Sequence, residues 1–259
     1  DMSDEQAVTV GVLALQGAFH EHIARFASLN TGNRSSVRVR AIAVRKPEQL
    51  ATCDAIVIPG GESTAIALGL RNANMTEPVR AWIAQGRPVW GTCAGMIMLA
   101  AVATGGKRGG QELLGGLDIQ VGRNGFGSQV FSFESEVDIP ALGSAFPGVF
   151  IRAPVVEHLL TDAAMIDQGF GLATPNETSS TLPVSVCTPE LRPHGPRPPV
   201  QVLGRLSHPP AVEPSAAPAP DAPIVAVRQG RLLATSFHPE LTQDMRLHAY
   251  FVKEVVLAK

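Results

Sequence analysis

Residues 88–102 read PVWGTCAGMIMLAAV, which predicts a short strand, a tight turn and an apolar helix in immediate succession. The strand covers residues 88–90 and the helix covers residues 96–102. Glycines on both sides of Cys93 relieve the crowding of a sharp strand-to-helix turn. The turn holds the thiol over the helix N-terminus, whose partial positive charge favours a thiolate. The pattern predicts a nucleophile elbow at Cys93, and the alternative is a glycine-rich turn with a structural cysteine.

Strands and helices alternate on the N-terminal side of this turn. Further strands are predicted at residues 9–15, 37–44 and 55–58, and helices at 19–29, 63–71 and 76–86. This alternation at short spacing is typical of a parallel α/β sheet, in which ligands bind at the carboxyl ends of the strands. Gln16-Gly17, Pro59-Gly60-Gly61 and the Cys93 turn each follow a strand, so we expect them to share one edge of the sheet.

Beyond residue 118 the pattern changes to short alternating stretches. Antiparallel strands are predicted at 118–121, 129–136 and 149–153, a hairpin at 224–228 and 232–237, and a terminal helix at 243–255. The fold class expected is therefore α/β, three-layered, with a mostly parallel central sheet and an antiparallel extension.

Residues 174–223 depart from this pattern. They contain 13 of the 21 prolines and no Phe, Trp or Tyr. Such a stretch buries too little apolar surface to offset the entropy lost on ordering. We therefore expect a proline-rich, disordered insertion within a single domain that spans residues 1–259.

The composition narrows the partners and the compartment. The net charge of −2 and the pI of about 6.4 do not call for nucleic acid or an anionic membrane as partner. No apolar run reaches the roughly 18 residues of a membrane helix. The three cysteines, Cys53, Cys93 and Cys187, are sparse and odd in number. This usage predicts free thiols in a reducing compartment, the cytoplasm.

His238-Pro239-Glu240 follows the last predicted strand. Proline pushes the residue before it into an extended conformation, and residues two apart on an extended chain point the same way. Glu240 can therefore orient the imidazole of His238 while the other ring nitrogen faces outward. A His and a Glu at this spacing can also be a surface pair. Together with Cys93, however, they complete the base and the orienting group that a thiol nucleophile needs.

Three further groups of residues have a functional and a plain interpretation. Pro59-Gly-Gly-Glu-Ser63 can form an oxyanion hole or a glycine turn with Ser63 as helix N-cap. Arg123 and Arg152 can hold a carboxylate together or be solvated surface charges. His20 and His22 have no third ligand near them, which favours a role on a helix surface over metal binding.

The motifs together resemble the class I, or triad, glutamine amidotransferases. Gly91-Thr-Cys93-Ala-Gly95 with His238-Pro-Glu240 carries this resemblance, which implies a flavodoxin-like α/β fold. Further stretches are similar to the glutaminase subunits of pyridoxal 5′-phosphate synthase: residues 11–17 (GVLALQG), 59–64 (PGGEST), 123–129 (RNGFGSQ), 150–154 (FIRAP) and 234–240 (ATSFHPE). The resemblance covers the chain except residues 174–223.

This resemblance implies an activity and a role for each matching residue. The family hydrolyses L-glutamine and passes the ammonia to a synthase subunit in a hetero-oligomer, without a cofactor or metal. The catalytic residues implied are Cys93, His238 and Glu240; the substrate-binding residues are Gly60, Gly61, Glu62, Arg123, Ile151 and Arg152; Gln16 and Gly17 organise and gate the oxyanion site. The alternatives are a glutaminase for another synthase, such as imidazole glycerol phosphate synthase, and a non-catalytic regulatory subunit.

Overall fold

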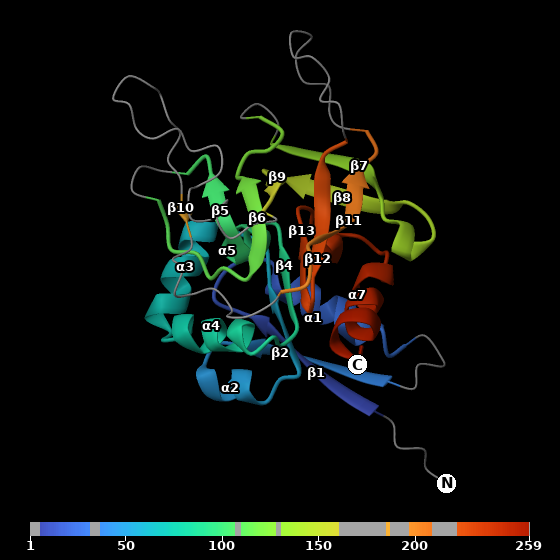
Figure 1. The fold of residues 1–259 in the computed structure, drawn as a ribbon. Coiled ribbons are helices and arrows are strands. Elements are labelled where there is room, and N and C mark those ends of the chain that lie inside the picture. Colours follow the sequence, from blue (N-terminus) through green and yellow to red (C-terminus); the bar gives the residue numbers. More distant parts are fainter. Residues whose placement is uncertain are drawn as a thin grey trace.

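A computed structural model describes residues 6–31, 37–106, 110–127, 131–160, 185–186, 197–208 and 222–258. Within these residues, thirteen strands join into one sheet (Figure 1). Every helix in the described ranges falls short of the length and apolar character that a bilayer-spanning segment needs.

The centre of the sheet is parallel, as predicted. Its order is β2-β1-β3-β4-β13, with all neighbours parallel. The bounds are Gln6–Leu13 for β1, Val37–Val44 for β2, Ala55–Ile58 for β3, Val89–Thr92 for β4 and Leu232–Thr235 for β13. The strands that precede Gly60 and Cys93 are therefore adjacent, and β13, which leads to His238, is the next neighbour of β4.

The extension continues from β13 through β12, β9, β6, β5 and β10, with all neighbours antiparallel except β6 and β5, which are parallel. These strands are β12 Ile224–Gln229, β9 Val155–Leu159, β6 Leu117–Gly122, β5 Ala100–Thr104 and β10 Ser185–Val186. A side ribbon branches from β12 and consists of β11 Gln201–Leu206, β7 Ser132–Asp138 and β8 Phe146–Ile151. The ribbon brings the end of β8 to the edge of the sheet where β4 and β13 end.

Helices cover both faces of the sheet (Figure 1). One layer contains α2 Pro47–Ala51, α3 Ser63–Asn72, α4 Thr76–Ala84 and α5 Ala94–Leu99; the other contains α1 Phe19–Ser28, α7 Arg246–Tyr250 and the π-helical η4 Phe251–Val256. In β3, Ile56 and Ile58 belong to the core under α3–α5, while Ala55 and Val57 belong to the core under α1 and α7. This alternation follows from a strand that is buried on both faces. The three-layer α/β prediction is confirmed.

Outside residues 174–223, two strands differ from the sequence prediction. The helix predicted to reach residue 102 ends at Leu99, and Ala100 starts β5, which pairs with β6 in parallel. An unbroken apolar run has no periodicity that would separate a buried helix from a buried strand. Strand β9 was not predicted.

Residues 174–223, where disorder was expected, contain the two-residue strand β10 and the longer strand β11. Strand β11 pairs antiparallel with β12 and with β7. The run QVLGRL contains no proline, and its Leu206 is 0% exposed in the core that holds Phe146 and Phe150. Composition averaged over fifty residues hides such a six-residue strand. Residues 174–184, 187–196 and 209–221 lie outside the described ranges.

We expect Leu206→Ala to lower the free energy of unfolding by about 2–5 kcal/mol, because it leaves a cavity beside buried aromatic rings. The neighbouring exposed Ser207→Ala should change it by less than about 0.5 kcal/mol. Urea unfolding followed by tryptophan fluorescence measures both. Equal stabilities of the two variants would mean that β11 contributes nothing to the fold.

Candidate active site

Cys93 occupies a strained turn between β4 and α5. Its backbone has φ +50° and ψ −108°, a region that residues other than glycine rarely adopt. The flanking glycines are needed for space. A Cβ at Gly91 would lie 2.5 Å from the carbonyl oxygen of Gly95, and a Cβ at Gly95 would lie 2.1 Å from that of Ile58. The sequence signature and the geometry of a nucleophile elbow therefore coincide at this position.

His238 and Glu240 reach the same place from the end of β13. The backbone N–H of Cys93 donates to Thr235, the last residue of that strand, at 2.8 Å. Glu240 lies in the short 3-10 turn η3, Pro239–Leu241, and its Oε1 is 2.6 Å from Nδ1 of His238. Its carboxylate is buried, with the residue 1% exposed. The structure thus brings the three predicted catalytic residues together.

The electrostatics of this cluster favour a charged imidazole. Burial alone would lower the pKa of His238, but the contacts with Cys93 and Glu240 raise it to about 10. Burial would raise the pKa of Glu240, whereas His22 and His238 hold it below its usual range. At neutral pH the proton therefore lies on His238, between Cys93 and the Glu240 carboxylate.

A glycine turn after β3 packs directly against this cluster. A Cβ at Gly60 would lie 2.3 Å from Cε1 of His238, so only glycine leaves room for the ring. The next residue, Gly61, has φ +157°, and a Cβ there would lie 2.2 Å from Oε1 of Gln16. That oxygen accepts a hydrogen bond from the backbone N–H of Glu62 at 3.1 Å. Gln16 therefore lies behind the turn and contacts it directly.

Gly17 allows the 16–18 turn to pack closely against the turn at Gly60 and Gly61. Its φ is +92°, and a Cβ there would lie 1.8 Å from the carbonyl oxygen of Gly60. That oxygen accepts a hydrogen bond from the backbone N–H of Ala18 at 3.1 Å. One hydrogen bond from the 16–18 turn thus sets the direction of the peptide between Gly60 and Gly61.

Glu62, rather than Ser63, caps helix α3. Its carboxylate accepts from the backbone N–H groups of Thr64 at 3.2 Å and Ala65 at 2.7 Å. Ser63 is then free to contact Arg123, whose Nη1 donates to the serine hydroxyl at 3.1 Å. Arg123 also donates to the side chain of Gln111 at 2.6 Å. These bonds hold the guanidinium at the wall of a pocket.

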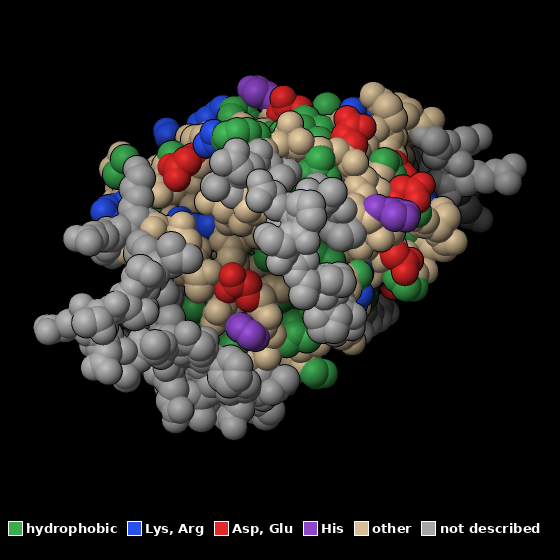
Figure 2. Space-filling model, turned by 90° about the horizontal axis from the view of Figure 1, so that it is seen from above, with side chains coloured by type: hydrophobic (Ala, Val, Ile, Leu, Met, Phe, Trp, Pro, Cys, Tyr) green, Lys and Arg blue, Asp and Glu red, His purple; other side chains and the backbone are tan. Residues whose placement is uncertain are grey.

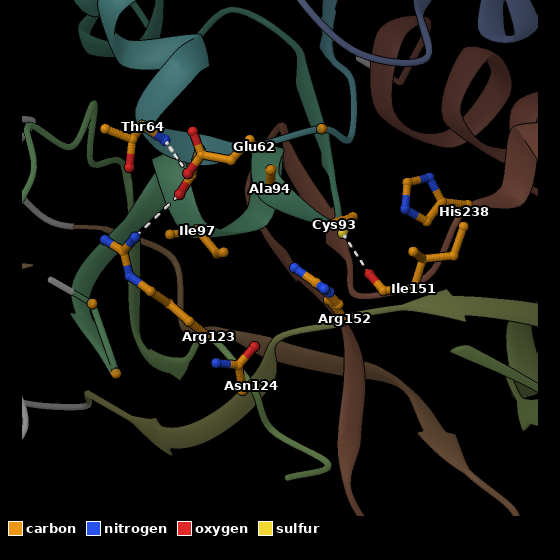
Figure 3. Close-up of a pocket in the computed structure, with 14 residues that line it drawn as sticks. Glu62, Thr64, Cys93, Ala94, Ile97, Arg123, Asn124, Ile151, Arg152 and His238 are labelled. Carbon is orange, nitrogen blue, oxygen red and sulfur yellow. Dashed lines mark hydrogen bonds between the residues drawn. The ribbon is translucent and has the colours of Figure 1, made fainter. Parts of the chain in front are cut away.

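The pocket has a volume of about 630 Å³, large enough for an amino acid (Figure 3). Seven of the predicted site residues line it: Gly61, Glu62, Cys93, Arg123, Ile151, Arg152 and His238. Four others, Gln16, Gly17, Gly60 and Glu240, are not part of its wall and lie behind it. Seen from above, acidic and basic side chains are interspersed over the described part of the surface (Figure 2).

Ile151 and Arg152 form a wall opposite the glycine turn, at the end of β8. The thiol of Cys93 lies 3.7 Å from the carbonyl oxygen of Ile151 (Figure 3). Arg152 has φ +44°, a second strained residue in the pocket, and its guanidinium lies 5.0 Å from the ring centroid of Phe131. Strain of this kind clusters where a site must hold a fixed geometry.

Sequence reasoning missed several residues of the pocket: Thr64, Ala94, Ile97, Gly105, Gly106 and Asn124. Ala94 and Ile97 follow the nucleophile on α5, and Asn124 follows Arg123, so adjacency could have indicated them. Gly105 and Gly106 follow β5, which was predicted as helix. Among the described residues no group of three His, Cys, Asp or Glu side chains is placed to hold a metal ion.

The prediction of a helix-surface role is wrong for His22. His20 is exposed, but His22 is 0% exposed and lies 3.3 Å from Oε2 of Glu240. No sequence signal marks this contact, because the two residues are more than 200 positions apart and helix α1 turns His22 inward.

Comparisons with known proteins agree with this geometry. Residues 12–171 and 202–257 match the SNO glutamine amidotransferase family. The chain is similar to the probable pyridoxal 5′-phosphate synthase subunit PDX2 of Arabidopsis thaliana, with 43% identity over 95% of this chain and 85% of that one. It is 44% identical to the pyridoxal 5′-phosphate synthase subunit PdxT of Acidothermus cellulolyticus, over 95% of this chain and 93% of that one.

The fold is also similar to that of a solved structure. A crystal structure described as a glutamine amidotransferase superposes with a TM-score of 0.66 at 38% identity, covering 95% of this chain and 98% of that one. The family match includes β11, since the segment that resumes at residue 202 starts inside that strand.

We expect the imidazole of His238 to stay protonated at pH 8, because its pKa is raised to about 10. Its ion pairs should stabilise the fold fully below about pH 6.5, and this contribution should vanish as the pH rises through about 10. Nitrogen-15 NMR of the histidine rings measures the pKa. Cys93→Ala should lower it, and Cys53→Ala, a buried thiol outside the pocket, should not. A His238 that titrates near 6.5 in the unaltered chain would contradict this.

Proposed function

The chain belongs to the SNO glutamine amidotransferase family, and on that premise we propose that it is the glutaminase subunit of a pyridoxal 5′-phosphate synthase. It hydrolyses L-glutamine to L-glutamate and ammonia, and the ammonia passes to a synthase subunit. The observation that carries this proposal is the meeting of Cys93, His238 and Glu240 at the ends of β4 and β13, against a pocket with arginines on its other side.

The first half of the reaction forms a thioester. In this proposal the sulfur of Cys93 attacks the side-chain amide carbon of glutamine as a thiolate, paired with the imidazolium of His238. The oxyanion that forms faces the backbone N–H groups of Gly61 and Ala94, the latter being the first residue of α5. His238 then donates its proton to the amide nitrogen. The carbon–nitrogen bond breaks, and ammonia leaves.

The second half returns the enzyme to its starting state. His238, now neutral, takes a proton from water, and the hydroxide oxygen attacks the thioester carbon. The carbon–sulfur bond breaks, glutamate forms, and the sulfur leaves as a thiolate beside His238, which keeps the proton it took from water. Glu240 keeps the ring oriented and stabilises its positive charge through the 2.6 Å contact.

The charged end of glutamine fits the other side of the pocket. Arg123 and Arg152 carry the positive charges that a substrate carboxylate requires, and Arg123 is already fixed by Ser63 and Gln111. Glu62 supplies negative charge near Arg123 for the substrate ammonium. A thiol nucleophile works in a reducing compartment, so we place the reaction in the cytoplasm.

The turn at Gln16 and Gly17 is the gate in this proposal. Ala18 holds the Gly60 carbonyl, and the carbonyl and N–H of one trans peptide point in opposite directions. A movement of the turn therefore redirects the N–H of Gly61 toward the oxyanion that forms. Docking of the synthase subunit in a hetero-oligomer supplies this movement, and L-glutamine turnover then begins.

We expect Cys93→Ala to abolish glutamate formation while fold and partner binding persist, since alanine fits the same space and lacks the nucleophile. Cys53→Ala is the matched control, because that thiol is also buried and should keep most of the activity. A coupled glutamate assay in the presence of the synthase subunit measures both. Residual turnover in pure Cys93→Ala protein would refute the assignment of the nucleophile.

We also expect the isolated chain to turn over glutamine slowly and to be activated by a pyridoxal 5′-phosphate synthase subunit. Titration of the chain with that subunit should raise the turnover number until the sites are saturated. An imidazole glycerol phosphate synthase subunit is the control and should not activate it. Equal rates with and without the first partner would rule out the gate, and activation by the control would assign the chain to another synthase.

A further inference from the structure

We propose that His22 is a positioning residue for glutamine hydrolysis, because it holds the carboxylate of Glu240 from the side opposite to His238. This inference rests on the proposed function. Glu240 divides its two oxygens between two histidines: Oε1 lies 2.6 Å from Nδ1 of His238, and Oε2 lies 3.3 Å from Nε2 of His22. The third residue of the triad is thus itself held by a fourth.

Burial makes this second contact important. His22 is 0% exposed and Glu240 is 1% exposed. A buried carboxylate oxygen without a donor costs far more than an exposed one, because it cannot recover the hydrogen bonds of water. Without His22, rotation of the Glu240 carboxylate toward another donor becomes more favourable, and this rotation would break its contact with His238.

The surroundings of His22 favour one neutral tautomer of its ring. Burial lowers the pKa of His22 in spite of the attraction of Glu240, so the ring is neutral and carries a single N–H. A proton on Nδ1 would turn the lone pair of Nε2 toward the carboxylate, which is repulsive. The proton is therefore on Nε2, which lies 3.2 Å from the hydroxyl of Thr92 and faces Oε2 of Glu240 at 3.3 Å. Oε2 makes no well-aligned hydrogen bond in the described residues, and a small rotation of the carboxylate would bring it onto this N–H.

A second buried histidine completes the arrangement. With its proton on Nε2, His22 presents Nδ1 as an acceptor, and Nε2 of His248 lies 3.1 Å from it. His248 is 0% exposed, and burial lowers its pKa well below the usual value, so it too is neutral and donates through Nε2. His248 then donates to His22, the Nε2–H of His22 faces Oε2 of Glu240, and Oε1 of Glu240 accepts from His238.

The backbone of the same turn is held by helix α1 as well. Nε of Arg25 donates to the carbonyl oxygen of Glu240 at 3.1 Å, and its Nη1 donates to Gln243 at 2.9 Å. Arg25 fixes the position of the turn, whereas His22 fixes the rotation of the carboxylate. A change at His22 should therefore alter the orientation of Glu240 without unfolding the turn.

This arrangement predicts a specific pH effect. Two titratable groups face Glu240: His22 from α1 and His238 from its own turn. His22 is also close to Glu21 on its own helix and to His248 from α7. The charge of Arg25 acts on His248. Removing the polar ring that lies 3.3 Å from Oε2 makes the carboxylate easier to protonate. A protonated Glu240 no longer supports the imidazolium, so activity should be lost at a higher pH than in the unaltered enzyme.

The test compares His22→Leu with His22→Gln in the chain activated by the synthase subunit. Gln keeps an N–H near the place of Nε2, and Leu does not. We expect His22→Leu to lower kcat by roughly 10- to 100-fold with little change in KM, the scale on which hydrogen-bond partners behind active-site groups act. The acid limb of its pH profile should move to higher pH. His22→Gln should keep most of kcat and the original limb.

Two further variants separate positioning from packing. Phe26→Leu removes a ring whose centroid lies 4.8 Å from that of His248, and it should lower stability without moving the acid limb. In a Glu240→Gln background, His22→Leu should cost little more, because its effect acts through Glu240. Equal behaviour of His22→Leu and His22→Gln, a limb shift in Phe26→Leu, or full additivity with Glu240→Gln would each overturn the proposal.

A measurement without turnover keeps the two proposals distinguishable. Nitrogen-15 NMR of the unaltered chain at pH 7 should show neutral His22 and neutral His248, each protonated on Nε2. His22 protonated on Nδ1 would overturn the positioning role even if glutamine is hydrolysed. The expected tautomers in a chain that fails to hydrolyse glutamine with any partner would leave the contact standing and refute the proposed function.

Discussion

The positive φ of Cys93 is the constraint on which the rest of the site depends. A residue with a side chain adopts this conformation only where its surroundings enforce it. Here β4 is paired on both sides, with β3 and β13, so the strand that leads into the turn cannot shift. Gly91 and Gly95 allow the backbone to close behind the thiol. The parallel sheet therefore supplies the force that keeps the sulfur at the pocket.

The same packing explains why the charges of the site stay together. The ring of His238 packs against Gly60, and a Cβ at Gly60 would meet both this ring and the Cβ of Cys93. A buried carboxylate is stable only when opposite charge or donors lie close to it, and in Glu240 Oε1 pairs with His238 at 2.6 Å while Oε2 lies 3.3 Å from His22. The catalytic groups are thus ordered by the need to satisfy buried polar atoms, as well as by their role in chemistry.

Much of the fold and of the site could be predicted from the sequence, and the wrong predictions have physical causes. Local sequence patterns predicted the parallel strands, the elbow at Cys93 and the pair of His238 with Glu240. Each of these features depends on residues that are close together in the sequence. His22 was misjudged because its partner is distant in sequence and one helical face decides its burial. Strand β11 was misjudged because its pairing with β12 and β7 is long-range, while the prolines around it dominate the local composition. For Asn124, the only sequence feature that could have indicated a place in the pocket is its position next to Arg123.

Helix α1 connects two parts of the site that act at different moments. It begins at Phe19, directly after the Gln16–Ala18 turn, and its residues His22 and Arg25 reach Glu240. A helix of ten residues is a stiff rod, and each added residue rotates the rest of the helix by about 100°. The spacing between Gly17 and His22 therefore works like the fixed length of a lever: an inserted or deleted residue would disconnect the gate from the carboxylate even if every side chain of the site remained.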